Sequence, residues 1–517
     1  MIFESKKNAK NNIKFGILEN FVGILCPFLV RTLTIYFLGQ SYIGINSLFT
    51  SFLSILSLAE LGFDSAVVCI MYESVSKEDK DTTCALLKFI RKAYFAVGST
   101  ILVLGILAIP IIKYLIKDPE SIPSDINIYI IYLIFLFDTC IGYFLGAYRN
   151  SVVNAYQRCD IISKAHSISL VSITILQSVL IVLFKNYTLY IITKPVATIL
   201  QNIIVITTSK ILFPDINPRG ELNIETKERV VKIVAGTFCG TLGARLSVGF
   251  DNIIVSSMLG IIILAKYSNY FYIVSALQGV YLIITNSLRS IIGNKVNTQS
   301  VEYNYSLLRE MTLIYTFLDA WGTITLFYLI QKFIKIWIGN EAMLPITVVG
   351  CICLYFYISI QDAVFQIFKE ALGIFWEDRY RAITGGVVNL IINILMVISL
   401  RNLGEEYALA GVVVSTIVSM SFILVPWAIK VTFDIYFKMG PKGYFMQLIY
   451  SFLAMIFSCI LTYPASLIID NYINNIYMNF IITGVMCLIV PTSILFFMFS
   501  RFDYFKDSFK FFKGIWR

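Results

Sequence analysis

The chain has 517 residues, of which 58% are hydrophobic and only 14% are charged, and its mean hydropathy is +0.78. Soluble domains carry roughly 25% charged residues, so the composition excludes an ordinary soluble protein. The single His removes most His-based chemistry, including a His-rich zinc site and a Ser-His-Asp array. The sequence therefore predicts an all-α polytopic membrane protein with no metal site and no catalytic residue.

Apolar runs bounded by charge, Gly or Pro predict fourteen membrane-spanning helices, because about 20 apolar residues cross the hydrocarbon core. In chain order they lie at 15–38, 47–71, 93–112, 127–147, 165–184, 188–209, 233–258, 264–288, 311–331, 346–368, 382–400, 408–429, 444–469 and 477–499. The longest polar connection of the first half separates spans six and seven. It is the natural boundary between two six-helix lobes that face each other across a central cavity.

These spans predict the following division of the chain. A cytoplasmic N-terminus at 1–14 precedes an N-lobe at 15–209, a cytoplasmic linker at 210–232 and a C-lobe at 233–429. Two additional helices at 444–499 and a basic, aromatic cytoplasmic tail at 500–517 complete it.

The positions of the cationic residues test this topology, since Lys and Arg in short loops stay on the cytoplasmic side. With a cytoplasmic N-terminus, 31 of the 41 Lys and Arg residues fall inside, six fall outside and four fall within spans. We therefore expect both termini to be cytoplasmic. The net charge of +9 then reflects topology and anionic lipid rather than binding to nucleic acid.

Several stretches resemble the Wzx-type bacterial polysaccharide flippases, a branch of the superfamily that includes the multidrug and toxin extruders. The similar segments are 40–49, 58–63, 265–270, 333–339, 371–380, 388–390 and 411–417, in the expected order along the chain. Gly385, Gly386 and Ser415 depart from the family pattern at positions that concern packing. The resemblance implies a MATE-like fold and movement of an undecaprenyl-diphosphate-linked oligosaccharide from the inner to the outer leaflet.

Two arginines inside the spans are candidate ligands for the transported headgroup. Arg31 lies about 17 residues into the first span, or about 25 Å at 1.5 Å per residue, and Arg245 lies at a comparable depth in the seventh. A guanidinium matches a diphosphate in a forked geometry, so the pair could hold the headgroup. The alternative is that each Arg pairs with a local acid or extends to the interface. Lys194 lies nearer the outer end of its span, where an interfacial position is favoured.

Intramembrane carboxyls are candidates for coupling transport to Na⁺ or H⁺. Asp251 follows Arg245 by six residues, and Glu60 and Asp64 share one helix face. Each could equally be a structural counter-ion for an Arg. Asp138, Asp319 and Asp362 are single acids for which packing against hydroxyl or amide neighbours is favoured. No other cofactor is expected.

Three competing functions remain open. A drug or metabolite extruder of the same fold needs a more acidic or aromatic cavity, and a peptidoglycan-precursor flippase would carry a related lipid. A membrane enzyme is disfavoured by the short outer loops and by the single His. The flippase reading implies a bacterial cytoplasmic-membrane location and membrane lipid as a partner, with a polysaccharide polymerase and glycosyltransferases as candidate partners.

Overall fold

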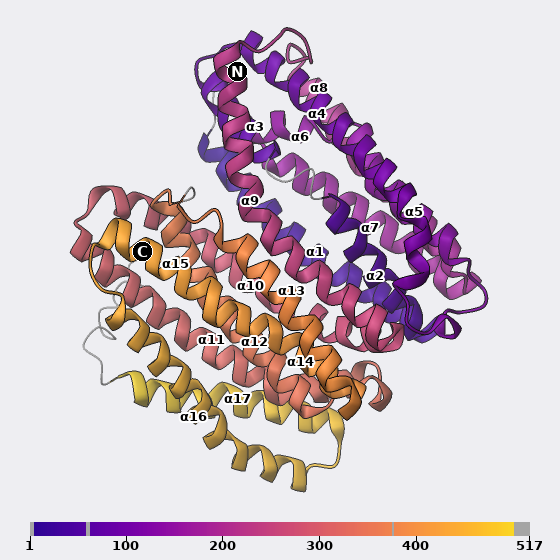
Figure 1. Cartoon of the computed structure of the whole chain (residues 1–517), viewed down its shortest axis with the longest axis vertical. Helices are drawn as coiled ribbons and strands as arrows, with labels where there is room; N and C mark the ends of the chain where they lie inside the picture. The colour runs from indigo at the N-terminus through magenta and orange to yellow at the C-terminus, as the bar shows by residue number, and fades with distance from the viewer. Residues whose placement is uncertain (1–4, 58–62, 375–376, 501–517) are drawn as a thin grey trace. The chain divides into compact units, whose positions relative to one another are not determined.

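A computed structural model describes residues 5–57, 63–374 and 377–500, and these residues form helices with no strand among them (Figure 1). The side chains of some helical residues, 235–248 among them, are not described. Of the predicted tail at 500–517, residues 501–517 also lie outside the described residues. The all-helical prediction is confirmed.

Ten of the described helices are long and apolar enough to cross a membrane, or eleven if the bent pair α5 (Ile128–Phe144) and α6 (Arg149–Ala155), which meet at 53°, is one span. The fourteen predicted spans therefore do not correspond one to one with the long apolar helices of the described residues. The predicted span 47–71, for example, is divided between α2 (Gln40–Leu56) and α3 (Phe63–Ser76).

The chain divides into two compact units, Met1–Ser268 and Asn269–Arg517. The predicted linker at 210–232 lies inside the first unit, so the proposed six-helix lobes stay a prediction. The division falls inside α10 (Ile261–Thr298), and α9 (Ile224–Ile254) belongs to the first unit because it packs against α2 and α3.

In the first unit, α1 (Ser5–Phe37) packs along α7 (Cys159–Phe184), and α8 (Tyr187–Leu212) packs against both α7 and α5. Polar side chains fix where several helices begin, because they accept hydrogen bonds from the free N–H groups of the first turn. Asp79 does so for α4 (Lys80–Leu107), Asn186 for α8 and Asn223 for α9. These caps position the polar residues that α8 carries into the membrane.

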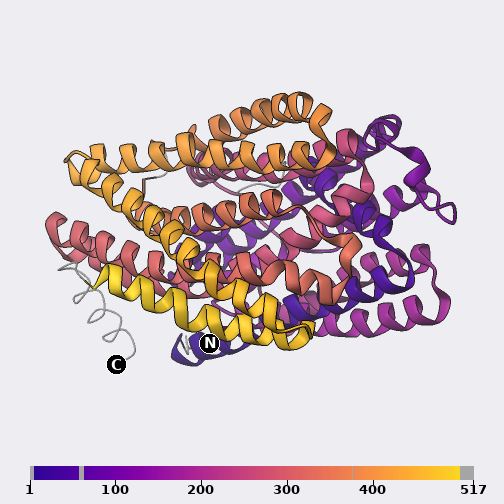
Figure 2. The same cartoon turned by 90° about the horizontal axis from the view of Figure 1, so that it is seen from below.

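In the second unit, α11 (Val301–Trp337) packs against α12 (Ile346–Ala371) and against α17 (Ile476–Phe499), which lies beside α16 (Lys442–Tyr472) (Figure 2). α13 (Arg381–Leu400) packs against α14 (Glu405–Ser419), which continues through a π-helical turn into α15 (Val425–Thr432). The Lys332 ammonium of α11 donates to Asp470, Asn479 and Thr483 at 2.6–2.7 Å. One partly buried cation therefore ties the last two helices to α11.

Close packing explains two of the positions that depart from the family pattern. A Cβ on Gly385 would lie 2.2 Å from a methyl group of Leu424, and the Ser419 hydroxyl donates to the Gly385 carbonyl at 2.7 Å. A larger residue at 385 would require the Leu424 side chain to move. Ser415 accepts a hydrogen bond from Asn389 at 3.4 Å and so joins the same two helices.

The linker of the first unit is docked rather than loose. Arg149 is 1% exposed, and its guanidinium donates to the Ile216 carbonyl at 3.0 Å and to the Asn217 side chain at 3.2 Å. The exposed Asp215 pairs with Lys80 at 2.7 Å, and the hydrogen bond from this ammonium holds the pKa of Asp215 below its ordinary value. That ion pair contributes at neutral pH and is lost as the pH falls through the lowered pKa.

We expect Arg149→Met to lower the free energy of unfolding by about 2–4 kcal/mol, because the buried Ile216 carbonyl and the Asn217 side chain both lose their donor. Thermal unfolding of the purified protein in lipid nanodiscs measures the loss. Arg219→Gln is the matched control, since Arg219 meets Asp81 only at 3.8 Å and both side chains are largely exposed. Equal shifts in the two variants would contradict the role given to Arg149.

Candidate functional site

The first predicted ligand, Arg31, lies on α1 inside the first unit. Its side chain is half-buried, and Nη2 donates to the Ser268 hydroxyl at 2.6 Å. Arg31 also interacts electrostatically with Tyr190 of α8. The guanidinium therefore contacts polar groups of other helices. It does not extend to the interface, as the alternative to headgroup binding would require.

Lys194 of α8 lies in the same region, and here the structure differs from the interfacial position favoured by the sequence. Its ammonium donates to Asn46 Oδ1 at 2.7 Å and lies 4.2 Å from the centre of the Phe135 ring. The Asn46 side chain is also hydrogen-bonded to Tyr190. The hydrogen bond to Asn46 and the face of the Phe135 ring thus take the place of water as partners of the Lys194 ammonium.

Asp138 of α5 supplies the carboxyl of the region. Its Oδ1 accepts a hydrogen bond from the Thr198 hydroxyl at 2.7 Å, and its charge interacts with that of Lys194. The resulting polar cluster of the first unit has seven members from five helices: Arg31, Asn46, Asp138, Tyr190, Lys194, Thr198 and Ser268. With two cations against one carboxyl, it favours an anionic ligand.

The other predicted site residues are only partly described. Asp251, near the end of α9, is 6% exposed and has interaction partners within the protein. The side chains of Arg245 and Asp64 lie outside the described residues, although both positions are helical, and Glu60 lies outside them altogether. The pairing of Arg31 with Arg245, and the ion-coupling roles of the three acids, stay predictions.

Sequence reasoning missed the contributions of Lys194 and Asn46. Lys194 stands in an apolar run, and such a residue is a functional candidate by default, but its direction cannot be read from its depth. Asn46 lies in the segment 40–49 that carries the family resemblance, but the sequence does not single it out as a site residue. Among the described residues, no group of three His, Cys, Asp or Glu side chains could hold a metal ion.

A family model described as "Polysaccharide biosynthesis protein" matches residues 9–288, which is more than half of the chain. The chain belongs to this polysaccharide biosynthesis family. The match covers all members of the polar cluster. No curated protein sequence matches the chain.

Solved structures show the fold that this family member adopts. The chain is similar to the lipid II flippase MurJ in an inward closed conformation, with a TM-score of 0.68 and 16% identity over 95% of this chain and 100% of that one. It is also similar to an inward-facing multidrug resistance MATE transporter, with a TM-score of 0.61 and 14% identity over 78% and 93% of the two chains. A MOP-superfamily transporter from Pyrococcus furiosus gives a TM-score of 0.55 at 12% identity over 84% and 97%. The family member is thus a multi-pass membrane protein with a MurJ- and MATE-like fold.

We expect Asn46→Leu to lower the free energy of unfolding of this family member by about 1–2 kcal/mol, because the ammonium of Lys194 and the hydroxyl of Tyr190 both lose a partner. Thermal unfolding in nanodiscs measures the effect. Asn46→Asp keeps an acceptor for Lys194 and is expected to unfold near the wild-type temperature. An Asn46→Leu protein as stable as the wild type would show that the bridge contributes nothing.

Proposed function

We propose that the protein is a flippase that moves an undecaprenyl-diphosphate-linked oligosaccharide from the inner to the outer leaflet by alternating access, for the biosynthesis of a surface polysaccharide. The observation that carries the proposal is the polar cluster, which holds Arg31 and Lys194 on two helices of a member of a polysaccharide biosynthesis family. A neutral or cationic substrate gives no reason to hold two cations there. A diphosphate does.

The contacts of the two cations suggest how the headgroup would be bound. Arg31 donates to a serine hydroxyl and Lys194 to an amide oxygen, both of which are neutral acceptors. Phosphate oxygens carry charge and form stronger hydrogen bonds with these donors. The phosphate oxygens of the headgroup would therefore replace Ser268 and Asn46 as acceptors for the two cations. The Ser268 hydroxyl and the Asn46 amide would remain nearby and could donate to other oxygens of the diphosphate.

Ion coupling belongs to the proposal as its second part. Asp251 is buried near the end of α9, and an intramembrane carboxyl can exchange a proton or Na⁺ during a transport cycle. Arg245 would add a third cation for the headgroup, and Glu60 and Asp64 would act with Asp251 or as counter-ions. We place the protein in a bacterial cytoplasmic membrane with both termini inside, where glycosyltransferases and a polysaccharide polymerase would supply and consume the lipid.

A peptidoglycan-precursor flippase is the second candidate function. The fold similarity to a lipid II flippase over the whole length of both chains favours it. The diphosphate contacts would be the same in both cases, so only the sugar distinguishes them. A drug extruder of the MATE type is disfavoured by the excess of cations in the polar cluster.

We expect Arg31→Ala and Lys194→Met each to weaken binding of undecaprenyl diphosphate by about tenfold or more, since each removes a charge-assisted hydrogen bond worth about 1.5–3 kcal/mol. Equilibrium binding of the labelled lipid to the full-length protein in nanodiscs measures the loss. Lys113→Ala is the matched control, because Lys113 is an exposed cation stacked on Tyr114 outside the cluster. Flipping of labelled lipid-linked oligosaccharide in proteoliposomes should fall in the same order.

Three results would count against this function. Wild-type affinity in both cluster variants, with intact folding, would remove the cations from headgroup recognition. Transport of a cationic drug without any flipping of lipid-linked saccharide would favour the extruder, and flipping of lipid II alone would favour the peptidoglycan precursor.

A further inference from the structure

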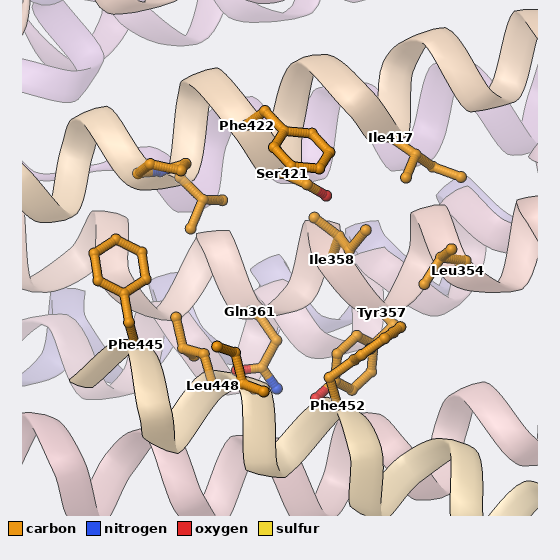
Figure 3. A pocket seen from close by; sticks show the side chains of 13 residues that line it. Leu354, Tyr357, Ile358, Gln361, Ile417, Ser421, Phe422, Phe445, Leu448 and Phe452 are labelled. Carbon is orange, nitrogen blue, oxygen red and sulfur yellow. The ribbon is translucent and has the colours of Figure 1, made fainter. Parts of the chain in front are cut away.

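The second unit contains a cavity of about 430 Å³ among α12, α16 and the segment that joins α14 to α15 (Figure 3). Its walls are almost entirely aliphatic and aromatic. The polar exceptions are Ser421, Tyr357 and Gln361, of which the last two project from the same helix, α12. The Tyr357 side chain is 4% exposed, and its hydroxyl has no hydrogen-bond partner among the described residues. Apolar walls with a few polar groups are typical of a ligand-binding cavity, and a buried hydroxyl without a partner needs an explanation.

A carboxyl group lies directly behind this wall. Asp319 stands near the middle of α11 and is fully buried. Its Oδ2 is 3.1 Å from Gln361 Nε2, and its Oδ1 is 3.4 Å from the Thr323 hydroxyl. Within the described part of the chain, no Lys or Arg forms an ion pair with it.

The groups around Asp319 do not favour its ionised form. From α10, Tyr281 faces it and donates its hydroxyl to the Leu318 carbonyl at 2.7 Å. Tyr357 of α12 also faces it. Toward α16, the Thr316 hydroxyl donates to the hydroxyl of Ser451. Cys487 of α17 lies one step further away, where its carbonyl accepts from Trp321. These titratable neighbours are two phenols and a thiol, and no Lys or Arg of the described residues forms an ion pair with Asp319 that would offset the desolvation of its carboxylate.

The Gln361 amide is arranged to respond to a proton on this carboxyl. Its Nε2 lies 3.2 Å from the Thr316 hydroxyl as well as 3.1 Å from Asp319, whereas its Oε1 is buried without a hydrogen-bond partner among the described residues. An ionised Asp319 accepts from the amide nitrogen in this orientation. A protonated Asp319 has an O–H to donate, and it would be satisfied by the same amide turned by 180°, with Oε1 facing the acid.

We propose that Asp319 is a membrane-embedded proton-binding site and that Gln361 relays its state to the wall of the cavity. The carboxylate takes up one proton to become a neutral acid, with no other bond made or broken. The amide then turns, which exchanges the positions of the NH₂ group and the carbonyl in a side chain that lines the cavity. A proton bound in the core of the second unit thereby changes the hydrogen-bonding character of the cavity, with Tyr357 beside it on the same helix.

Proton binding at Asp319 does not depend on which lipid the protein carries, so its failure would be separate from failure of the proposed function. The test is infrared spectroscopy of the full-length protein in nanodiscs, because a protonated carboxylic acid has a carbonyl stretch apart from the amide bands. We expect a buried-acid band at neutral pH that Asp319→Asn removes and Asp319→Glu restores at a shifted position. Asp362→Asn is the matched control, since Asp362 is a neighbouring acid on α12 that instead accepts from Gln366 at 2.9 Å.

Gln361→Leu tests the relay separately. Without an amide acceptor, the acid band of Asp319 should remain and move to higher frequency, as expected for a carboxyl that has lost a hydrogen bond. The proposal is overturned if no band sensitive to Asp319→Asn appears between about pH 5 and about pH 9. It is also overturned if Na⁺, but not K⁺, abolishes the band at constant pH, which would make Asp319 a sodium ligand, or if Gln361→Leu leaves the band unshifted.

Discussion

The cost of a polar group inside a bilayer governs the arrangement of this protein. An Asp, Lys or Arg at the centre of a membrane helix costs about 2.5–3.5 kcal/mol even on insertion scales, and water is not there to reduce it. Each such side chain must find its partners on neighbouring helices. The first unit meets this requirement for Lys194 with Asn46 and the Phe135 ring, and the second meets it for Lys332 with three acceptors from α16 and α17.

Both units accommodate charged side chains within the membrane. The charges concerned are cationic in the polar cluster of the first unit and acidic at Asp319 in the second. In the first unit, Arg31 and Lys194 donate to neutral acceptors and a single carboxyl, Asp138, lies in the same cluster, so its cations outnumber its carboxyls. In the interior of the second, Asp319 has only neutral neighbours among the described residues, and a proton can neutralise it. Lys332, by contrast, donates to three acceptors on α16 and α17, one of which is a carboxylate. The excess of cations over carboxyls is what makes the polar cluster of the first unit a candidate site for an anion.

Hydropathy and charge were sufficient to predict the helical fold. The predicted spans 346–368 and 477–499 correspond closely to α12 and α17, because long apolar runs have only one stable state in lipid. The breaks were not predictable in the same way. The bend after α5 and the π-helical turn after α14 arise where helices pack closely, as at Gly385, and hydropathy does not record packing.

The candidate site was only half predictable for a related physical reason. Depth in the membrane follows from position in the sequence, so Arg31 could be singled out, but the direction of a side chain depends on what the neighbouring helix offers. Lys194 has enough length to extend outward, yet Asn46 lies within 2.7 Å of its ammonium and is itself held by Tyr190. A single amide on α2 thus decides whether a long cation is an interfacial anchor or part of an internal site. Asn46 carries no charge and therefore gave no signal in a search for charges, although it bridges the groups on which the site depends.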